Sequence, residues 1–401
     1  MSEHIPVTVL SGALGAGKTT TLNHVLTADH GLEVAVVVND MGEVNVDVDH
    51  VENQSQLSQS DEEIIEMSNG CICCRLRGDM LDAVGELVQR REFDYLLVES
   101  SGISEPIPVA QTFTLGFEDA EYDPTEDYRL DTMVSVVDAH ALAEGFESGQ
   151  SLVNEEMTGG TERVPEEVLM DQIEFCDVLL LNKCDLVTEA QLDEIEAVLE
   201  HLQPRAKIVR TEFGQVDPTE ILDTGRFDFE EAKGSAGWKH ELQHEHHHDP
   251  AEEHGVESFV FSTNRPLHPE RFADLLAQLP AEIIRAKGFF WSAGREDVAM
   301  GLDKAGQSVR AGPSGKWIAT LPPAEQQRYL ERMPSARENW DDTWGDRGAE
   351  LVFIGREYGP EDLKEWLNDC VLTDEEMDES WEKYEDPFGA DEQRELALAD
   401  D

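Results

Sequence analysis

Short apolar runs alternate with amphipathic segments along the first half of the chain. The apolar runs predict strands at 6–10, 34–38, 95–98, 132–137 and 178–181. Helical spacing of apolar residues begins at Thr20 and recurs at 80–90 and 190–202. Strands that alternate with helices form a doubly wound, mostly parallel sheet, so the sequence predicts an α/β fold.

The 401 residues are enough for two domains. The regular pattern ends near Asp223, and apolar runs resume at Val256, with strands predicted at 258–262, 289–292 and 350–354. We predict a first domain at 1–222, a histidine-rich acidic linker at 223–255, a smaller α/β domain at 256–372 and a loosely ordered acidic tail at 373–401. Polar segments at 116–127 and 147–162 are predicted to be surface insertions.

A glycine-rich block directly follows the first predicted strand. Residues 12–19 read Gly-Ala-Leu-Gly-Ala-Gly-Lys-Thr and precede the first helical segment. The backbone N–H groups of such a loop surround phosphates, Lys18 supplies a cation, and the Thr19 hydroxyl is a ligand for Mg²⁺. The order of strand, loop and helix favours a P-loop NTPase over a chance glycine turn. The predicted nucleotide-binding residues are Gly12, Gly15, Ala16, Gly17, Lys18, Thr19 and Thr20.

A second motif follows the strand predicted at 178–181. Residues 182–185 read Asn-Lys-Cys-Asp. The Asp185 carboxylate can accept hydrogen bonds from the ring N–H and the exocyclic amine of guanine, two donors that adenine does not present together. Alone, four such residues are weak evidence, because Asn and Asp are common in turns. After a strand and downstream of a P-loop, they predict a guanine site formed by Asn182, Lys183 and Asp185.

Between these motifs, three thiols lie within four residues: Cys71, Cys73 and Cys74. Thiolates are soft ligands that suit Zn²⁺ or Cu⁺, and a carboxylate, an imidazole or water can complete the coordination. A redox disulfide or small buried side chains are the alternatives. The remaining cysteines are scattered and are expected to be packing residues: Cys176, Cys184 and Cys370.

In their order and spacing, these blocks resemble the CobW-like GTPase metallochaperones. The matching segments are 12–19, 39–47, 70–74, 99–102, 170–175 and 182–185, followed by 264–269, 285–291, 344–347 and 350–355. The resemblance covers most of the chain, and the segments at 39–47 and 344–347 are most similar to the branch associated with zinc homeostasis. It implies a P-loop GTPase domain followed by a CobW-type C-terminal domain.

The resemblance also implies roles for residues beside the P-loop. Glu99 matches a strand-end carboxylate that holds Mg²⁺ together with Thr19, so that Lys18, Thr19 and Glu99 are the catalytic candidates. Without the family pattern, a glutamate after a strand is usually just solvated. Gly102 matches a glycine that reports on the γ-phosphate.

For the metal, the resemblance adds Glu43 of the first switch as an oxygen ligand beside the three cysteines. Some relatives carry a glutamate at the position of Val38, so a ligand assigned there in those proteins is not transferred to this chain. The fourth zinc ligand therefore stays open.

The charge of the chain indicates its environment and excludes some partners. There are 87 acidic and 30 basic residues, a net charge of −57. Such a surface repels itself at low ionic strength but is tolerated at molar salt, where the Debye length is roughly 3 Å. We expect a salt-loaded cytoplasm, as in an extreme halophile, and neither nucleic acid nor membrane as a partner. No apolar run approaches the ~18 residues of a membrane helix.

A histidine-rich tract around 240–249 is a second candidate for metal binding, through His244, His246, His247 and His248. Clustered imidazoles and carboxylates bind Zn²⁺, Ni²⁺ or Co²⁺ and can raise the local ion concentration. A hydrophilic linker that binds nothing is the alternative.

In the second domain, we predict core positions for Phe289, Phe290 and Trp291. Exposed contacts for a partner are predicted at Arg285, Lys287, Asp346 and Arg347.

Together these features predict a GTP-hydrolysing metallochaperone that binds GTP, Mg²⁺ and zinc and delivers zinc to a client apo-metalloprotein. Glu43 and the three cysteines lie along the chain between the P-loop and the segment 99–102, so nucleotide should alter metal affinity and, by linkage, metal should alter GTP affinity. No general base is evident, so slow intrinsic turnover is expected. Delivery of Co²⁺ for corrinoid synthesis and a non-catalytic, nucleotide-responsive metal buffer or sensor remain as alternatives.

Overall fold

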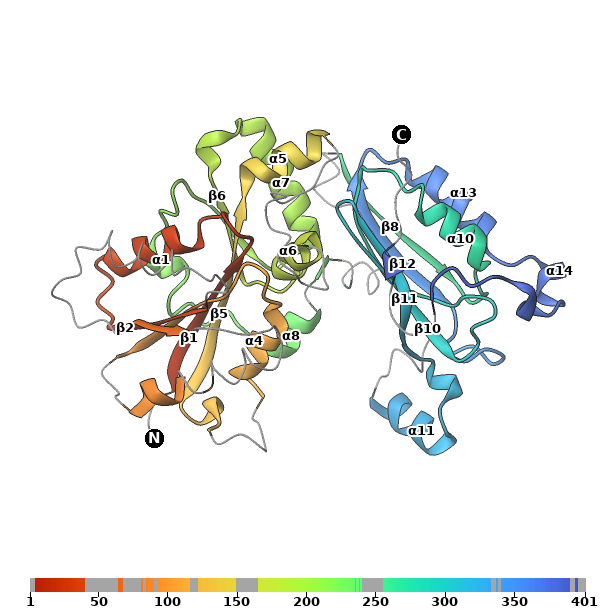
Figure 1. Cartoon of the computed structure of the whole chain (residues 1–401), viewed down its shortest axis with the longest axis horizontal. Coiled ribbons are helices and arrows are strands. Elements are labelled where there is room, and N and C mark those ends of the chain that lie inside the picture. The colour runs from red at the N-terminus through yellow and green to blue at the C-terminus, as the bar shows by residue number, and fades with distance from the viewer. Residues whose placement is uncertain are drawn as a thin grey trace. The chain divides into compact units, whose positions relative to one another are not determined.

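The structure is a computed structural model (Figure 1). It describes residues 4–39, 64–67, 81, 84–89, 93–115, 122–148, 165–234, 236–237, 239, 255–332, 337, 340–389 and 394–395. Contacts divide the chain into two compact units, the first holding the described residues up to Gly237 and the second those from Lys239 onward. Among the helices described, none is long and apolar enough to cross a bilayer.

The first unit is built on a parallel sheet that has seven strands within the described residues. They are β1 (Ile5–Gly12), β2 (Val34–Asn39), β3 (Ile64–Met67), β4 (Tyr95–Glu99), β5 (Tyr128–Asp138), β6 (Val178–Asn182) and β7 (Lys207–Arg210). Their order is β3-β2-β4-β1-β5-β6-β7. β1 lies between β4 and β5. The strands β2 to β4 are added on one side of β1 and the strands β5 to β7 on the other, and ligands of such sheets bind at the carboxyl ends of the strands beside this switch point.

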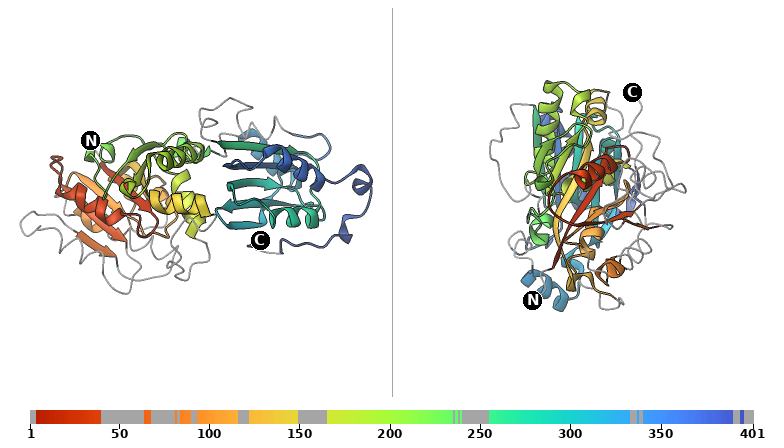
Figure 2. Two further views of the ribbon diagram at one scale, coloured as in Figure 1. Left: turned by 90° about the horizontal axis from the view of Figure 1, so that it is seen from above. Right: turned by 90° about the vertical axis from the view of Figure 1, so that its left-hand side faces the viewer.

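Helices cover both faces of this sheet (Figures 1 and 2). They are α1 (Lys18–Thr27), α4 (Pro106–Thr112), α5 (Ala139–Ser148), α6 (Pro165–Glu174), α7 (Glu189–Leu202) and α8 (Phe229–Gly234). Short 3₁₀ turns lie at η1 (Pro124–Glu126), η3 (Cys184–Leu186) and η4 (Pro218–Glu220). Alternate residues of β2 enter two separate cores, Val36 packing with Leu22 of α1 and Val37 with Ala110 of α4. Burial on both faces explains why these strands read as continuous apolar runs.

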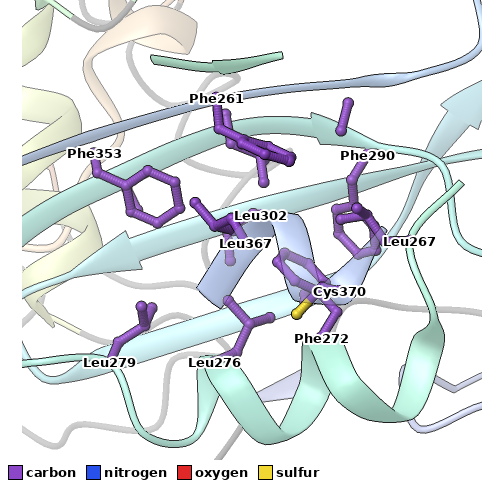
Figure 3. Close-up of a cluster of buried hydrophobic side chains, with 14 of the residues drawn as sticks. Phe261, Leu267, Phe272, Leu276, Leu279, Phe290, Leu302, Phe353, Leu367 and Cys370 are labelled. Carbon is purple, nitrogen blue, oxygen red and sulfur yellow. The ribbon is translucent and has the colours of Figure 1, made fainter. Parts of the chain in front are cut away.

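The second unit is an antiparallel sheet with helices packed on it. Its strands are β8 (Val256–Thr263), β9 (Ile283–Phe290), β10 (Val298–Ala305), β11 (Ser308–Lys316), β12 (Ala349–Arg356) and β13 (Arg394–Glu395), in the order β13-β11-β10-β9-β12-β8. Its helices and 3₁₀ turns are α10 (Pro269–Leu276), η6 (Ile318–Thr320), α11 (Pro323–Arg332), α13 (Pro360–Cys370), α14 (Asp374–Met377) and η7 (Trp381–Lys383). α10 and α13 pack on one face of the sheet, where Phe272, Leu276 and Leu367 meet Phe290 and Phe353 (Figure 3).

The structure confirms the predicted α/β fold with its parallel sheet, and each strand expected in the first half is present. The four-residue strands β3 and β7 were not predicted, because so short a run carries little periodicity. The β10–β11 hairpin was also missed. Charged residues and glycines interrupt its apolar pattern, including Asp303, Lys304, Gly301 and Gly312.

The prediction of a loosely ordered tail is wrong for residues 374–389. Glu376 pairs with Arg271 at 2.9 Å, and this guanidinium lowers the pKa of the Glu376 carboxyl to about 2. Phe388 is fully buried and packs edge-to-face on Phe290. Composition alone was misleading, because the acidic residues find arginine partners and a single aromatic side chain anchors the segment in the core.

Candidate functional site

The glycines of the P-loop meet two different requirements. Gly12, with φ of 138°, lies so near β5 that a Cβ there would be 2.2 Å from the Val136 carbonyl oxygen. Gly17, with φ of 109°, would clash in the same way with Asn182 Nδ2 at 2.2 Å. Gly15, with φ of 75°, has no atom within 4 Å of its Cβ position. Gly12 and Gly17 therefore allow close packing, whereas Gly15 faces open space along the loop.

Lys18 and Thr19 begin α1 directly after the loop. The Lys18 side chain is largely buried, and its Nζ donates hydrogen bonds to the carbonyl oxygens of Gly12 at 3.0 Å and Ala13 at 3.2 Å. The ammonium group is thus held against the loop backbone. Ala16 is buried, and Thr20 is exposed in the first turn of the helix. The helix itself contributes no acidic residue to that turn.

Glu99 ends β4 beside β1 and faces the start of α1. Thr19 Oγ1 donates a hydrogen bond to Glu99 Oε1 at 2.9 Å, and the Glu99 side chain is 4% exposed. The adjacent Ser100 N–H bonds the Leu10 carbonyl oxygen at 2.9 Å and fixes the strand end against β1. A hydroxyl and a carboxylate in contact offer the hard oxygen ligands that Mg²⁺ prefers, so the donor set fits that ion.

Gly102 lies against the P-loop. A Cβ at this position would be 2.8 Å from the backbone nitrogen of Leu14 and 3.2 Å from its Cα. No side chain fits there without moving the loop. The segment that follows Glu99 therefore contacts the P-loop through its backbone.

Asn182, at the end of β6, joins the P-loop to the loop after β7. Its Nδ2 donates to the Ala16 carbonyl oxygen at 2.9 Å. Its Oδ1 accepts from Thr211 Oγ1 at 3.1 Å and from the Gly214 N–H at 3.0 Å. The side chain is only 2% exposed. The first residue of the predicted guanine motif thus organises its surroundings.

The next residues of the motif turn toward solvent. Lys183 has a left-handed φ of 63°, and its Nζ lies 2.5 Å from Asp138 Oδ2. The other Asp138 oxygen accepts from the N–H groups of His140 and Ala141 at the start of α5. Asp138 therefore fixes Lys183 and caps a helix at once. Asp185 is exposed in the turn η3, so its carboxylate is available to a ligand.

Residues 211–214 complete this side of the site and were missed by the sequence analysis. A Cβ on Gly214, whose φ is 67°, would be 2.7 Å from the backbone nitrogen of Thr21 in α1. Its neighbour Phe213 has a φ of 53° and is 64% exposed. An exposed aromatic residue with left-handed backbone beside the P-loop makes Phe213 a candidate for a functional position. The sequence signal, Phe-Gly shortly after a strand, is too common to be recognised alone.

The predicted metal ligands lie outside the described residues: Cys71, Cys73, Cys74, Glu43, His244, His246, His247 and His248. Within the described part of the chain, His, Cys, Asp and Glu form no group of three or more suited to a metal ion.

The isolated cysteines behave largely as expected. Cys176 and Cys370 are buried and Cys184 is partly buried, each as a free thiol. Burial raises the pKa of the Cys184 thiol and raises that of Cys370 to about 12. These groups therefore stay protonated near neutrality and act as packing residues.

Several predictions for the second unit need correction. Arg285 is not an exposed contact: it is fully buried, and its guanidinium bonds Asp303 at 2.5 Å. Asp346 accepts the N–H groups of Ile318 and Ala319 and so caps η6. Phe290 is buried as predicted, but Phe289 is 47% exposed. Alternation along β9 places these neighbours on opposite faces of the sheet.

The two other residues are only partly exposed. Lys287 lies 3.3 Å from Asp303. Arg347 lies over the ring of Trp291, which is buried as predicted, and donates to the Glu296 carbonyl oxygen. Both cations therefore have partners within the unit.

Comparison with known proteins gives one family match within each of the two units. A family model described as CobW/HypB/UreG, nucleotide-binding domain, matches residues 6–210, and one described as cobalamin synthesis protein cobW C-terminal domain matches 256–371. The chain is 41% identical over 410 residues to zinc-regulated GTPase metalloprotein activator 1 of Dictyostelium discoideum, covering 98% of this chain and 86% of that protein. It is 29% identical to zinc chaperone CobW of a Sinorhizobium species, covering 88% of this chain and 92% of that protein.

Among solved structures, the Zn(II)-bound YjiA GTPase from E. coli aligns at 22% identity over 92% of this chain and 100% of that chain, with a TM-score of 0.41. The two family matches and the extent of the 41% identity settle the assignment. This chain belongs to the CobW/HypB/UreG family of GTPases and carries the CobW C-terminal domain.

Proposed function

We propose that this protein is a GTP-hydrolysing metallochaperone that binds zinc and delivers it to a client metalloprotein, with the nucleotide state controlling its affinity for zinc. The observation that carries the proposal is the convergence of Lys18, the Thr19–Glu99 pair and Asn182 around one phosphate loop. The names of the related zinc chaperones and of the zinc-regulated activator support zinc as the cargo.

The phosphate side of the site follows from the loop geometry. The open space at Gly15 and the N–H groups at the start of α1 suit the phosphates of GTP. Lys18, now bonded to Gly12 and Ala13, can turn its ammonium toward the outer phosphates. Thr19 and Glu99 would hold Mg²⁺, which neutralises charge on the phosphates when bound.

The base side relies on groups that the fold already positions. Asp185 is exposed and can accept from the two guanine donors. Lys183 is held by Asp138 and can lie along the base, while the exposed ring of Phe213 can cover a purine face. Replacement of guanine by adenine would leave the Asp185 carboxylate without those donors.

The topology supports a zinc site beside the nucleotide. β3, β2 and β4 are neighbouring parallel strands, and Asn39 is paired with Met67, as Val38 is with Glu99. The carboxyl ends of β2 and β3 thus lie at the same sheet edge as the Glu99 end of β4. Along the chain, Glu43 follows Asn39 by four residues and Cys71 follows Met67 by four residues. We propose Cys71, Cys73, Cys74 and Glu43 as zinc ligands.

The coupling can be tested by titrating zinc into the reduced protein at molar KCl, with GDP or a non-hydrolysable GTP analogue bound. We expect the two zinc affinities to differ by a factor of about 5 to 150, the usual range of such couplings. Equal affinities would remove the coupling. Joint replacement of Cys71, Cys73 and Cys74 by serine should abolish the high-affinity zinc, whereas Cys176→Ser, a change at a buried thiol, should retain it.

The alternatives give different results in two further measurements. A non-catalytic buffer or sensor predicts no sustained phosphate release, whereas a chaperone predicts slow turnover that responds to zinc. Elemental analysis of protein purified under reducing, high-salt conditions distinguishes zinc from Co²⁺, which thiolates also accept. Deletion of residues 239–254 should lower the metal stoichiometry but not GTP turnover if the histidine tract is a metal store.

The acidic composition supports a salt-rich cytoplasm as the working environment. At a net charge of −57, self-repulsion favours unfolding at low ionic strength. We expect the midpoint of thermal unfolding to rise steeply between about 0.1 and 2 M KCl, because the Debye length shortens with ionic strength and the repulsion between acidic side chains weakens. A midpoint independent of salt would contradict this assignment.

A further inference from the structure

Gln172 of α6 contacts the segment that follows Glu99. The side chain is fully buried, and its Nε2 donates to the Ser104 carbonyl oxygen at 3.0 Å, with a longer contact to the Gly102 carbonyl oxygen at 3.5 Å. Both partners are carbonyl oxygens, so only the amide nitrogen can face them. The orientation of the amide is therefore fixed by its surroundings.

The two carbonyl groups belong to the segment that touches the P-loop. At Gly102, a Cβ would be 2.8 Å from the Leu14 nitrogen. The segment turns through a Ser104 N–H bond to the Ser101 carbonyl oxygen at 3.0 Å and enters α4 at Pro106. The hydrogen bond from Gln172 to Ser104 therefore holds the same short segment whose Gly102 backbone abuts the P-loop.

The other end of the amide is unsatisfied. Gln172 Oε1 is buried and has no hydrogen-bond partner among the described residues. A buried acceptor without a donor is costly. A glutamine is favoured here if a second arrangement of residues 102–104 brings a backbone N–H to Oε1.

We infer that Gln172 is a positioning residue that holds segment 102–104 against the P-loop in one nucleotide state and exchanges partners in the other. This inference rests on the proposed function, because it requires that GTP and GDP favour different arrangements of the segment. In the present arrangement the amide donates to Ser104. In the other arrangement, Oε1 accepts a hydrogen bond from a backbone N–H of the displaced segment. The position of α6 then changes with the nucleotide state.

The test compares Gln172→Met and Gln172→Glu with the wild type in steady-state GTP hydrolysis and in affinity for GDP and a non-hydrolysable GTP analogue. The first variant removes both hydrogen-bonding groups, and the second removes the donor. We expect both to lower kcat about tenfold or more, to keep GDP affinity within about twofold, and to reduce the preference between the analogue and GDP. A residue with only a structural role would change stability but leave this preference intact.

Gln203 provides a matched control. It is buried in the same unit, at the end of α7, and its side chain bonds the Glu174 carbonyl oxygen rather than the P-loop side. Gln203→Met should reduce stability without changing the ratio of analogue to GDP affinity. Wild-type kcat and ratio in the Gln172 variants, or an equal change in Gln203→Met, would overturn the inference.

A measurement on the wild type covers the case in which the variants do not fold. Amide hydrogen exchange at 101–106 and along α6 should differ between the GDP and GTP-analogue states. Identical exchange in both states rejects the exchange of partners, even if the protein hydrolyses GTP. Absence of GTP binding and hydrolysis in the wild type would instead reject the proposed function, and the inference with it.

Discussion

Replacement of Asn182 by alanine should remove the hydrogen bonds that connect the P-loop with the loop after β7. The change deletes the bond from Nδ2 to Ala16 and both bonds that Oδ1 accepts, from Thr211 and Gly214. Because the position is 2% exposed, water cannot easily replace them. Each lost hydrogen bond costs about 0.5–1.5 kcal/mol, and each stranded group up to about 3 kcal/mol. We expect the free energy of unfolding to fall by about 2–4 kcal/mol.

The same change should weaken GDP and GTP together. Ala16 belongs to the phosphate loop, and Gly214 contacts α1 from the base side, so Asn182→Ala loosens both parts of the site. A 100-fold loss of affinity corresponds to about 2.7 kcal/mol, within the interaction energy removed. Asn182→Asp keeps the acceptor for Thr211 and Gly214 but sets a carboxylate against the Ala16 carbonyl oxygen. It should therefore weaken phosphate binding with a smaller effect on the base side.

The assay is urea unfolding at molar KCl with and without GDP, combined with calorimetric titration of both nucleotides. Asn264→Ala is the control, because its Nδ2 bonds Asp341 at 3.1 Å on an exposed surface of the second unit. That variant should stay within about 0.5 kcal/mol of the wild type. An Asn182→Ala protein with unchanged stability and nucleotide affinity would refute the bridging role.

Three further predictions concern the loop, a buried cation and the C-terminal segment. Gly15→Ala should fold but lose GTP affinity, because its Cβ would enter the open space of the loop, whereas Gly17→Ala should unfold more easily, since its Cβ meets Asn182 Nδ2 at 2.2 Å; unfolding curves and GTP titrations distinguish these outcomes. Burial lowers the pKa of Lys304 to about 8, so the unfolded state binds more protons between pH 8 and about 10.5, and wild-type stability should gain roughly 3 kcal/mol across that range relative to Lys304→Met. Parallel wild-type and variant curves of unfolding free energy against pH would contradict this assignment. Phe388→Ala should cost about 3–5 kcal/mol in the second unit, as for other fully buried phenylalanines; a change below about 1 kcal/mol in urea unfolding would show that the segment is not anchored.

The sequence reveals most of the first unit because its signals are local. A strand such as β6, buried on both faces, needs an apolar run, and the P-loop needs glycines at fixed spacing next to Lys18. The β10–β11 hairpin lacks such a signal, since the fully buried Lys304 and its neighbour Asp303, which pairs with the buried Arg285 of β9, look like surface residues in the sequence. Their burial depends on partners that are distant along the chain.

The candidate site divides in the same way. Lys18, Thr19 and Asn182 are recognised from motifs, and the structure brings them together. Gly214 lies in no recognised motif, and Gln172 lies in the family-like segment 170–175 without an evident role; what each does is seen only from contacts with α1 and with the segment after Glu99. A residue whose role is to hold a backbone segment leaves no characteristic spacing, so a single sequence could not identify it.

The contacts of the site converge on one short stretch of chain. Gly102 abuts Leu14, Asn182 bonds Ala16, Glu99 bonds Thr19, and Gly214 abuts Thr21. Three parts of the chain that are distant in sequence, 99–102, Asn182 and Gly214, therefore contact residues 14–21. A phosphate group that shifts this stretch should therefore displace both the end of β4 and the loop after β7, which contains Gly214. β4 lies beside β2, and β2 beside β3, so we expect the same displacement to extend to the strand ends that precede Glu43 and Cys71 along the chain. Nucleotide and metal affinity are therefore expected to change together through packing alone, without a dedicated relay.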